Sequence, residues 1–147
     1  MSKLKTIVLK WKKYHSYKEV REDDYAWFDP TKPESNGKGI YLMADSKCVP
    51  LYIGRANGKW GFADRYNATG FLDAAIEHAG NLIYFAEVES RLLCKDIETQ
   101  LIWEEQKCNK MVCKYNGIKA APQRNVDIRH EGDVPNFIFM SNQSKAV

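Results

Sequence analysis

The sequence Gly-Ile-Tyr-Leu-Met-Ala-Asp-Ser-Lys-Cys-Val-Pro-Leu-Tyr-Ile-Gly occupies residues 39–54 and predicts a β-hairpin. The residues on either side of Asp-Ser-Lys are apolar and rich in β-branched and aromatic side chains, which is typical of strands. Asp-Ser-Lys itself has the composition of a turn. Each strand carries one tyrosine, Tyr41 and Tyr52, and Gly39 and Gly54 bracket the unit. Taken alone, this pattern favours an ordinary hairpin whose tyrosines pack on a sheet face.

Length and composition limit the class of protein. The chain has 147 residues, a length that suits one domain with its own core. Apolar residues make up 44% and charged residues 28%, so we expect a soluble globular protein. There is no apolar run of about 18 residues and no apolar N-terminal segment, which predicts an intracellular, cytoplasmic protein without membrane association. The four cysteines form no Cys-x-x-Cys pair, so reduced thiols are expected and a zinc site is not.

Positive charge is concentrated at the N-terminus. Residues 1–21 carry a net charge of +6, whereas the remainder of the chain carries −3. Lys10, Lys12 and Lys13 surround an aromatic side chain, and basic segments of this kind suit a polyanion such as nucleic acid. The alternative is a lysine-rich edge strand, because lysine also protects strand edges from aggregation. The segment itself fits both interpretations.

Hydrophobic patterning predicts the remaining elements. The expected elements are strands at 4–11, 81–88 and 136–140, short helices at 62–67 and 72–78, and a long helix at 90–107. Residues 12–38 and 109–135 are polar and rich in turn-forming residues, so we expect them to be largely irregular.

The long helix contains a carboxylate in an unusual position. Its apolar stripe recurs every fourth residue, at Leu93, Ile97 and Leu101. Glu98 has Cys94 and Ile102 as its neighbours one turn away, which places it on the flank of that stripe. An unpaired buried carboxylate is costly, so Glu98 should meet a cation or a metal. Alternatively, its stem packs while its carboxylate reaches water, and helix geometry alone leaves both possibilities open.

The two halves of the hairpin resemble the signatures of a nuclease family. Gly39-Ile40-Tyr41 and Tyr52-Ile53-Gly54 are similar to the GIY-YIG signatures, and the tyrosines stand 11 residues apart, as is usual in that family. The resemblance covers residues 38–122. It implies a small α/β domain of the α+β type, with a central antiparallel sheet flanked by helices. Residues 1–37 would then be a basic arm or strand packed on the domain, and residues 123–147 a C-terminal extension.

The resemblance also implies a set of site residues. Family members use an arginine on the helix after the second signature, which Arg65 fits by context, and Arg55 is its rival directly after that signature. The family's metal-binding glutamate precedes a Leu-Ile pair on a long helix, and Glu98 matches this pattern. A late asparagine follows in a Tyr-Asn context, which Asn116 fits best and Asn125 second.

The sequence departs from the family pattern in two places. The loop before Arg65 is about three residues longer than is common. Many members carry His or Tyr one turn after this arginine, where this chain has Thr69. Tyr66 and His78 are the candidates to take that role.

Phosphodiester hydrolysis explains why these residue types would be gathered. Tyr41 or Tyr52 would accept a proton from the attacking water. A phenol with a pKa of about 10 is a poor base at neutral pH, and nearby cations favour the phenolate. Lys59, Arg55 and Arg65 are the expected cations. An arginine also binds phosphate through two parallel charge-assisted hydrogen bonds.

The implied cofactor is one divalent metal ion. Glu98 would hold Mg²⁺ or Mn²⁺, and a single carboxylate suffices because magnesium is completed by water and substrate phosphate oxygens. The basic arm would add phosphate contacts that carry no sequence information. The residues expected to contact the nucleic acid are Lys59, Asn116, Lys10, Lys12 and Lys13.

The sequence therefore predicts a metal-dependent endonuclease that hydrolyses DNA phosphodiester bonds. One alternative is a catalytically inactive nucleic-acid-binding module on the same fold. Another is a protein-interaction domain whose tyrosines only pack. We recognise no helix-turn-helix or zinc finger in the sequence, so site specificity would come from a homodimer or a targeting partner.

Overall fold

The computed structural model confirms three predicted features: the hairpin, the strand expected at 81–88 and the long helix. It describes residues 6–15, 37–56, 82–88, 91–109, 113, 116, 121–122 and 126–140. The described elements are β1 (Thr6–Tyr14), β2 (Gly39–Ala44), β3 (Pro50–Ala56), β4 (Leu82–Glu87), α4 (Arg91–Cys108) and β5 (Asp127–Gly132). The helices expected at 62–67 and 72–78 lie outside the described residues, as does most of the segment 12–38.

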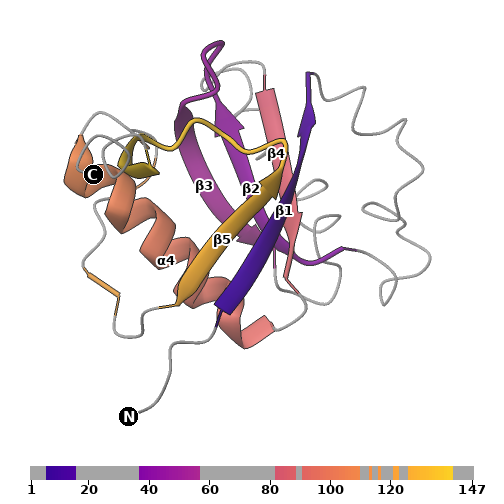
Figure 1. The fold of residues 1–147 in the computed structure, drawn as a ribbon, viewed down its shortest axis with the longest axis vertical. Coiled ribbons are helices and arrows are strands. Elements are labelled where there is room, and N and C mark those ends of the chain that lie inside the picture. The colour runs from indigo at the N-terminus through magenta and orange to yellow at the C-terminus, as the bar shows by residue number, and fades with distance from the viewer. Residues whose placement is uncertain are drawn as a thin grey trace.

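The described strands form one sheet in the order β3-β2-β4-β1-β5 (Figure 1). Neighbouring strands are antiparallel from β3 to β1, whereas β1 and β5 run parallel. The expectation of an antiparallel sheet is therefore correct for four strands and wrong for the fifth. The protein is a small α+β domain with a mixed sheet, and its basic arm and C-terminal extension both contribute strands to that sheet.

The turn between β2 and β3 is held by the side chain that the sequence indicated. Asp45 Oδ1 accepts hydrogen bonds from the backbone N–H of Lys47 at 2.8 Å and of Val49 at 3.0 Å. Cys48 adopts a positive φ of 66°, which completes the reversal of the chain. Both strands are thereby fixed in the register that pairs Tyr41 with Gly54.

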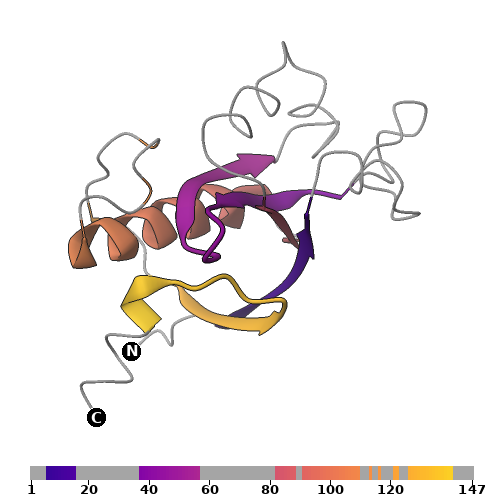
Figure 2. The ribbon, with the colours of Figure 1, turned by 90° about the horizontal axis from the view of Figure 1, so that it is seen from above.

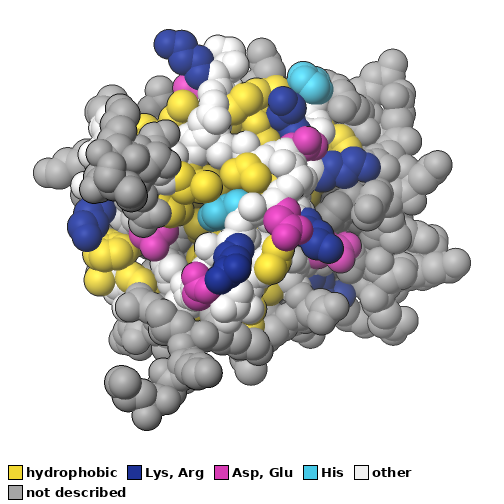
Figure 3. Space-filling view, in the orientation of Figure 1, with side chains coloured by type: hydrophobic (Ala, Val, Ile, Leu, Met, Phe, Trp, Pro, Cys, Tyr) yellow, Lys and Arg dark blue, Asp and Glu magenta, His cyan; other side chains and the backbone are white. Residues whose placement is uncertain are grey.

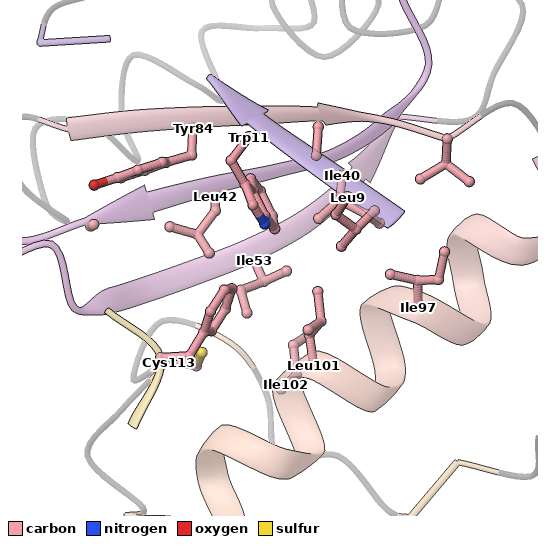
Figure 4. Close-up of a cluster of buried hydrophobic side chains, with 14 of the residues drawn as sticks. Leu9, Trp11, Ile40, Leu42, Ile53, Tyr84, Ile97, Leu101, Ile102 and Cys113 are labelled. Atoms are coloured by element: carbon pink, nitrogen blue, oxygen red, sulfur yellow. The ribbon is translucent and has the colours of Figure 1, made fainter. Parts of the chain in front are cut away.

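The core lies between the sheet and α4 (Figure 4). The apolar stripe predicted on the helix is present, and Ile97, Leu101 and Ile102 are fully buried. They pack with alternate residues of the hairpin, Ile40, Leu42 and Ile53. Because successive residues of a strand point to opposite faces, this contact identifies the face of the sheet that α4 covers.

The C-terminal predictions were wrong in two places. The segment expected to be irregular contains β5, and residues 138–140, expected to form a strand, form a helical turn. The β5 sequence Asp-Ile-Arg-His-Glu-Gly is mostly polar and half-exposed because the strand lies at one end of the described sheet. Outer strands commonly carry charges, so apolar content is a poor guide to them.

The segment after β5 closes the open side of the curved sheet (Figure 2). Asn136 donates from its backbone N–H to the Cys48 carbonyl at 2.9 Å and from Nδ2 to the Lys47 carbonyl. Glu105 of α4 accepts hydrogen bonds from the backbone N–H of Ile138 at 3.1 Å and of Phe139 at 3.3 Å. The C-terminal segment is therefore tied to both the hairpin turn and the helix.

A histidine lies inside this closure. Trp11 donates from Nε1 to Nδ1 of His130 at 2.9 Å, and the buried Phe137 ring lies 4.8 Å from the imidazole. Burial lowers the pKa of His130 to about 4. Because Nδ1 accepts a hydrogen bond from Trp11, the neutral ring carries its proton on Nε2, which is buried without a hydrogen-bond partner in the described part of the chain.

Candidate active site

The two signature tyrosines lie together on the face of the sheet opposite α4. Tyr41 of β2 is 1% exposed, and its ring centroid lies 6.0 Å from that of the half-buried Tyr52, at an interplanar angle of 31°. They share a face because Tyr41 pairs with Gly54, two residues after Tyr52. The structure thus brings together the two phenols that the sequence proposed as candidate bases.

The second signature glycine is required by the first signature tyrosine. A Cβ atom built on Gly54 would overlap the Tyr41 ring and its hydroxyl group. The phenol of Tyr41 therefore lies directly over the backbone of β3. Gly39 is constrained in the same way, because a Cβ there would overlap the Ala86 carbonyl and lie 2.8 Å from Val88 N. Gly54 thus makes room for a side chain, and Gly39 makes room for the backbone of β4.

Replacing Gly54 with alanine should displace the Tyr41 ring and lower the free energy of unfolding by about 1–3 kcal/mol, as overpacking typically does. Chemical denaturation measures this loss. In the background of Tyr41→Ala the same substitution should cost clearly less, because the overlapping ring is gone. Additive losses in the double variant would show that the ring does not lie over Gly54.

Glu98 meets a cation, which is one of the two possibilities that its position on the helix left open. Its Oε1 lies 3.7 Å from a guanidinium nitrogen of Arg55, and the two side chains are 11% and 33% exposed. Arg55 follows Gly54 on β3 and pairs with Ile40, so its side chain lies on the face that α4 covers. The structure therefore places Arg55, one of the two arginines proposed from the sequence, against the glutamate.

The tyrosine pair and the Arg55–Glu98 pair therefore lie on opposite faces of the sheet. They meet at β3, which is the end strand of the described sheet. The Tyr41 hydroxyl lies over Gly54, and the adjacent residue is Arg55. Adjacent residues of one strand therefore connect the two pairs, with the Tyr41 ring against Gly54 on one face and the Arg55 side chain on the other.

Asn116 fixes the strand between the two pairs. Its Oδ1 accepts from Ile53 N at 2.9 Å, and its Nδ2 donates to Ile53 O at 2.8 Å. Cys113 donates its backbone N–H to the Pro50 carbonyl on the same strand. These bonds satisfy backbone groups on the side of β3 away from β2. Asn116 thus positions the site, and a contact with nucleic acid remains a prediction.

Lys12 lies on the tyrosine face. Lys12 pairs with Phe85, and Phe85 pairs with Tyr41, so the lysine stands in register with that tyrosine two strands away. Its ammonium lies 5.5 Å from the centroid of the Tyr14 ring. The sheet alternation places Lys10 on the same side and Lys13 on the α4 side. Of the three lysines predicted on β1, Lys12 is therefore the one in register with Tyr41.

Acidic residues with no predicted role lie beside β1. Lys10 pairs with Glu131 of β5, and Asp133 Oδ2 accepts from the backbone N–H of Lys13 at 3.1 Å. The described side chains on this face carry charges of both signs (Figure 3). The three acids at positions 127, 131 and 133 were the sequence signal for this acidic neighbour. They reduce the positive potential expected of the basic arm.

Two predicted site residues, Lys59 and Arg65, lie outside the described residues, as do Tyr66, Thr69, His78 and Asn125. Within the described ranges, no three His, Cys, Asp or Glu side chains gather as a metal cluster. Glu98 offers carboxylate oxygens of the kind that Mg²⁺ and Mn²⁺ accept, and its charge is balanced here by a cation. The carboxylate itself fits a metal that is completed by water and phosphate oxygens, while the Arg55 guanidinium is its partner in this structure.

Comparison with known proteins identifies no relative, because no family model, curated protein or solved structure matches this chain. Among the described helices, none combines the length and hydropathy of a membrane span. What can be said of function accordingly depends on the residues at β3 and α4 themselves.

Proposed function

We propose that this protein is a metal-dependent endonuclease that hydrolyses DNA phosphodiester bonds through a GIY-YIG-like site. The observation that carries the proposal is the convergence at β3. The Tyr41 phenol lies over Gly54, and the next residue, Arg55, is 3.7 Å from Glu98. This arrangement brings a candidate base on β2, a candidate phosphate-binding guanidinium on β3 and a candidate metal-binding carboxylate on α4 to two adjacent residues of β3, Gly54 and Arg55.

A phosphodiester would have to lie beside the Gly54–Arg55 end of β3 to use both pairs. Gly54 contributes no side chain there, and the Tyr41 ring lies directly against its backbone. Arg55, one-third exposed, would bind the phosphate oxygens through its planar fork. Tyr41 or Tyr52 would accept the proton of the attacking water. The metal held by Glu98 would act as a Lewis acid on the leaving oxygen.

A binding module without catalysis is the second candidate, and one observation favours it. The phenols and the Glu98 carboxylate lie on opposite faces of the sheet, so a substrate must reach around β3 to contact both. A protein that only binds nucleic acid needs no such shared position. Lys12 in register with Tyr41 would suffice to place a phosphate backbone on the tyrosine face.

Incubation with supercoiled plasmid separates the two functions. The nuclease should convert plasmid to nicked or linear forms with Mg²⁺ or Mn²⁺ and should stop when a chelator is added. Linear, branched and single-stranded DNA tested in parallel would define the preferred substrate. Binding should also be measured in chelator over a salt series. For each tenfold rise in salt concentration, log K should fall by about 0.9 per phosphate contact. Salt-dependent binding without cutting under any metal would establish the binding module instead.

A further inference from the structure

The contact between Arg55 and Glu98 has the character of a loose ion pair. At 3.7 Å, the guanidinium nitrogen and the carboxylate oxygen are too far apart for a good hydrogen bond and close enough for strong charge attraction. Glu98 is 8% exposed as a whole residue, so its carboxylate has largely left water. A carboxylate in that position requires a counter-charge, which Arg55 provides.

A metal ion at Glu98 would compete with that counter-charge. Two cations cannot both take the same carboxylate at short range without repelling one another. A guanidinium near the carboxylate therefore weakens metal binding for as long as it stays there. The proposed reaction, however, also needs Arg55 at the phosphate, which offers this side chain a second anionic partner.

We infer that Arg55 is an exchangeable counter-ion that holds Glu98 in a metal-poor state until a phosphodiester arrives. This inference rests on the proposed function and adds a mode of regulation to the same site. When DNA binds, Arg55 transfers its charge to the phosphate, and the Glu98 carboxylate becomes available to the metal. Metal and DNA then bind with positive coupling, and each raises the affinity of the protein for the other by the same factor.

The structure allows this exchange without movement of the strand. Asn116 bonds both backbone groups of Ile53, two residues before Arg55, and Tyr41 lies over Gly54. The backbone at this point is therefore fixed, and the exchange is confined to the Arg55 side chain. One-third of that side chain is exposed, and arginine has enough rotatable bonds to change partner by rotation alone.

Direct titration with Mn²⁺, followed by electron paramagnetic resonance without DNA, tests the inference. Arg55→Gln should bind Mn²⁺ about tenfold more tightly than the wild type, because the competing charge is gone. Arg55→Lys, which keeps the charge, should remain within a few-fold of wild type. Arg129→Gln is the matched control, since it removes an equal charge from an exposed ion pair of the same 3.7 Å length on β5. It should leave Mn²⁺ affinity unchanged.

A second measurement starts from the wild-type protein, so its main result does not depend on the folding of a variant. Saturation with a duplex carrying non-hydrolysable linkages should raise Mn²⁺ affinity about tenfold, and the rise should be lost in Arg55→Gln. Equal or weaker Mn²⁺ binding by Arg55→Gln would overturn the exchange while leaving the nuclease proposal standing. Unchanged Mn²⁺ binding by Glu98→Gln would instead overturn the metal site, and with it the proposed function.

Discussion

Glu98→Gln should abolish metal-dependent cutting of DNA while leaving DNA affinity in chelator within a few-fold of the wild type. The substitution removes the negative charge and one of the two carboxylate oxygens, and keeps the size of the side chain. Loss of about 3 kcal/mol of transition-state stabilisation by the metal corresponds to a rate reduction of about 100-fold or more. Plasmid cleavage rates at saturating Mg²⁺ and Mn²⁺ measure the effect.

The control for Glu98→Gln lies on the same helix. Glu104 is half-buried and accepts a hydrogen bond from Gln100 at 3.4 Å, one turn along α4. Glu104→Gln removes the same charge from the helix and should cut DNA at the wild-type rate. Both variants should unfold within about 1 kcal/mol of the wild type, because glutamine keeps the size of each side chain and the cation left by Glu98→Gln, Arg55, is one-third exposed. Equal loss of cutting in the two variants would point to helix charge and not to a metal site.

Glu98→Asp distinguishes a ligand from a structural carboxylate. It keeps the charge and shortens the side chain by one methylene group, so the ion pair with Arg55 is stretched in either case. A metal ligand should lose most of its Mg²⁺-supported rate and retain more of the Mn²⁺-supported rate, because Mg²⁺ demands the stricter geometry. A purely structural carboxylate would show no dependence on the identity of the metal.

Local patterns predicted the part of the site that is encoded in a short stretch. The hairpin, its turn residue Asp45 and the stripe of α4 were correct because alternation and helical periodicity act between near neighbours. The cation beside Glu98 was expected on physical grounds, and Arg55 was already a candidate. One feature of the site could not be predicted in this way. The sequence did not show that the phenols and the carboxylate lie on opposite faces, since that depends on how α4 packs.

The segment after α4 could not be predicted for a different physical reason. The pairing of β5 with β1 joins residues about 120 positions apart, and the strand has little apolar content. Its position is determined by tertiary contacts, among them Trp11 with His130 and Glu105 with the turn at 138–140. The hydrophobic periodicity of the sequence does not predict contacts of this kind. Glu105 and His130, whose pKa values are shifted by burial, lie at these contacts and make stability depend on pH.

Glu105 and His130 should oppose one another as pH changes. Burial is the main cause that raises the pKa of Glu105 to about 7 from 4.5, with a smaller contribution from Glu104, while its two backbone hydrogen bonds act in the opposite direction. Between pH 4.5 and 7 the folded protein holds a proton that the unfolded chain has released. Stability due to Glu105 therefore falls as pH rises through that window, by on the order of 3 kcal/mol in full.

His130 acts with the opposite sign. Burial lowers its pKa to about 4 from 6.5, so the unfolded chain binds a proton in this range that the folded protein does not. Stability due to His130 therefore rises with pH between 4 and 6.5, again by on the order of 3 kcal/mol in full. In the overlapping range, from pH 4.5 to 6.5, the two contributions cancel. The wild type should show little pH dependence there from this pair.

Single substitutions should reveal the pH dependence of stability that is due to each group. In Glu105→Gln the free energy of unfolding should rise by about 2 kcal/mol from pH 4.5 to 6.5, because His130 then acts alone. In His130→Asn, whose Oδ1 can still accept from the Trp11 indole, it should fall by about the same amount over that range. Urea titrations followed by tryptophan fluorescence measure both slopes. Parallel pH profiles for the wild type and both variants would mean that neither group is buried as the structure places it, and that the C-terminal segment does not close over the sheet.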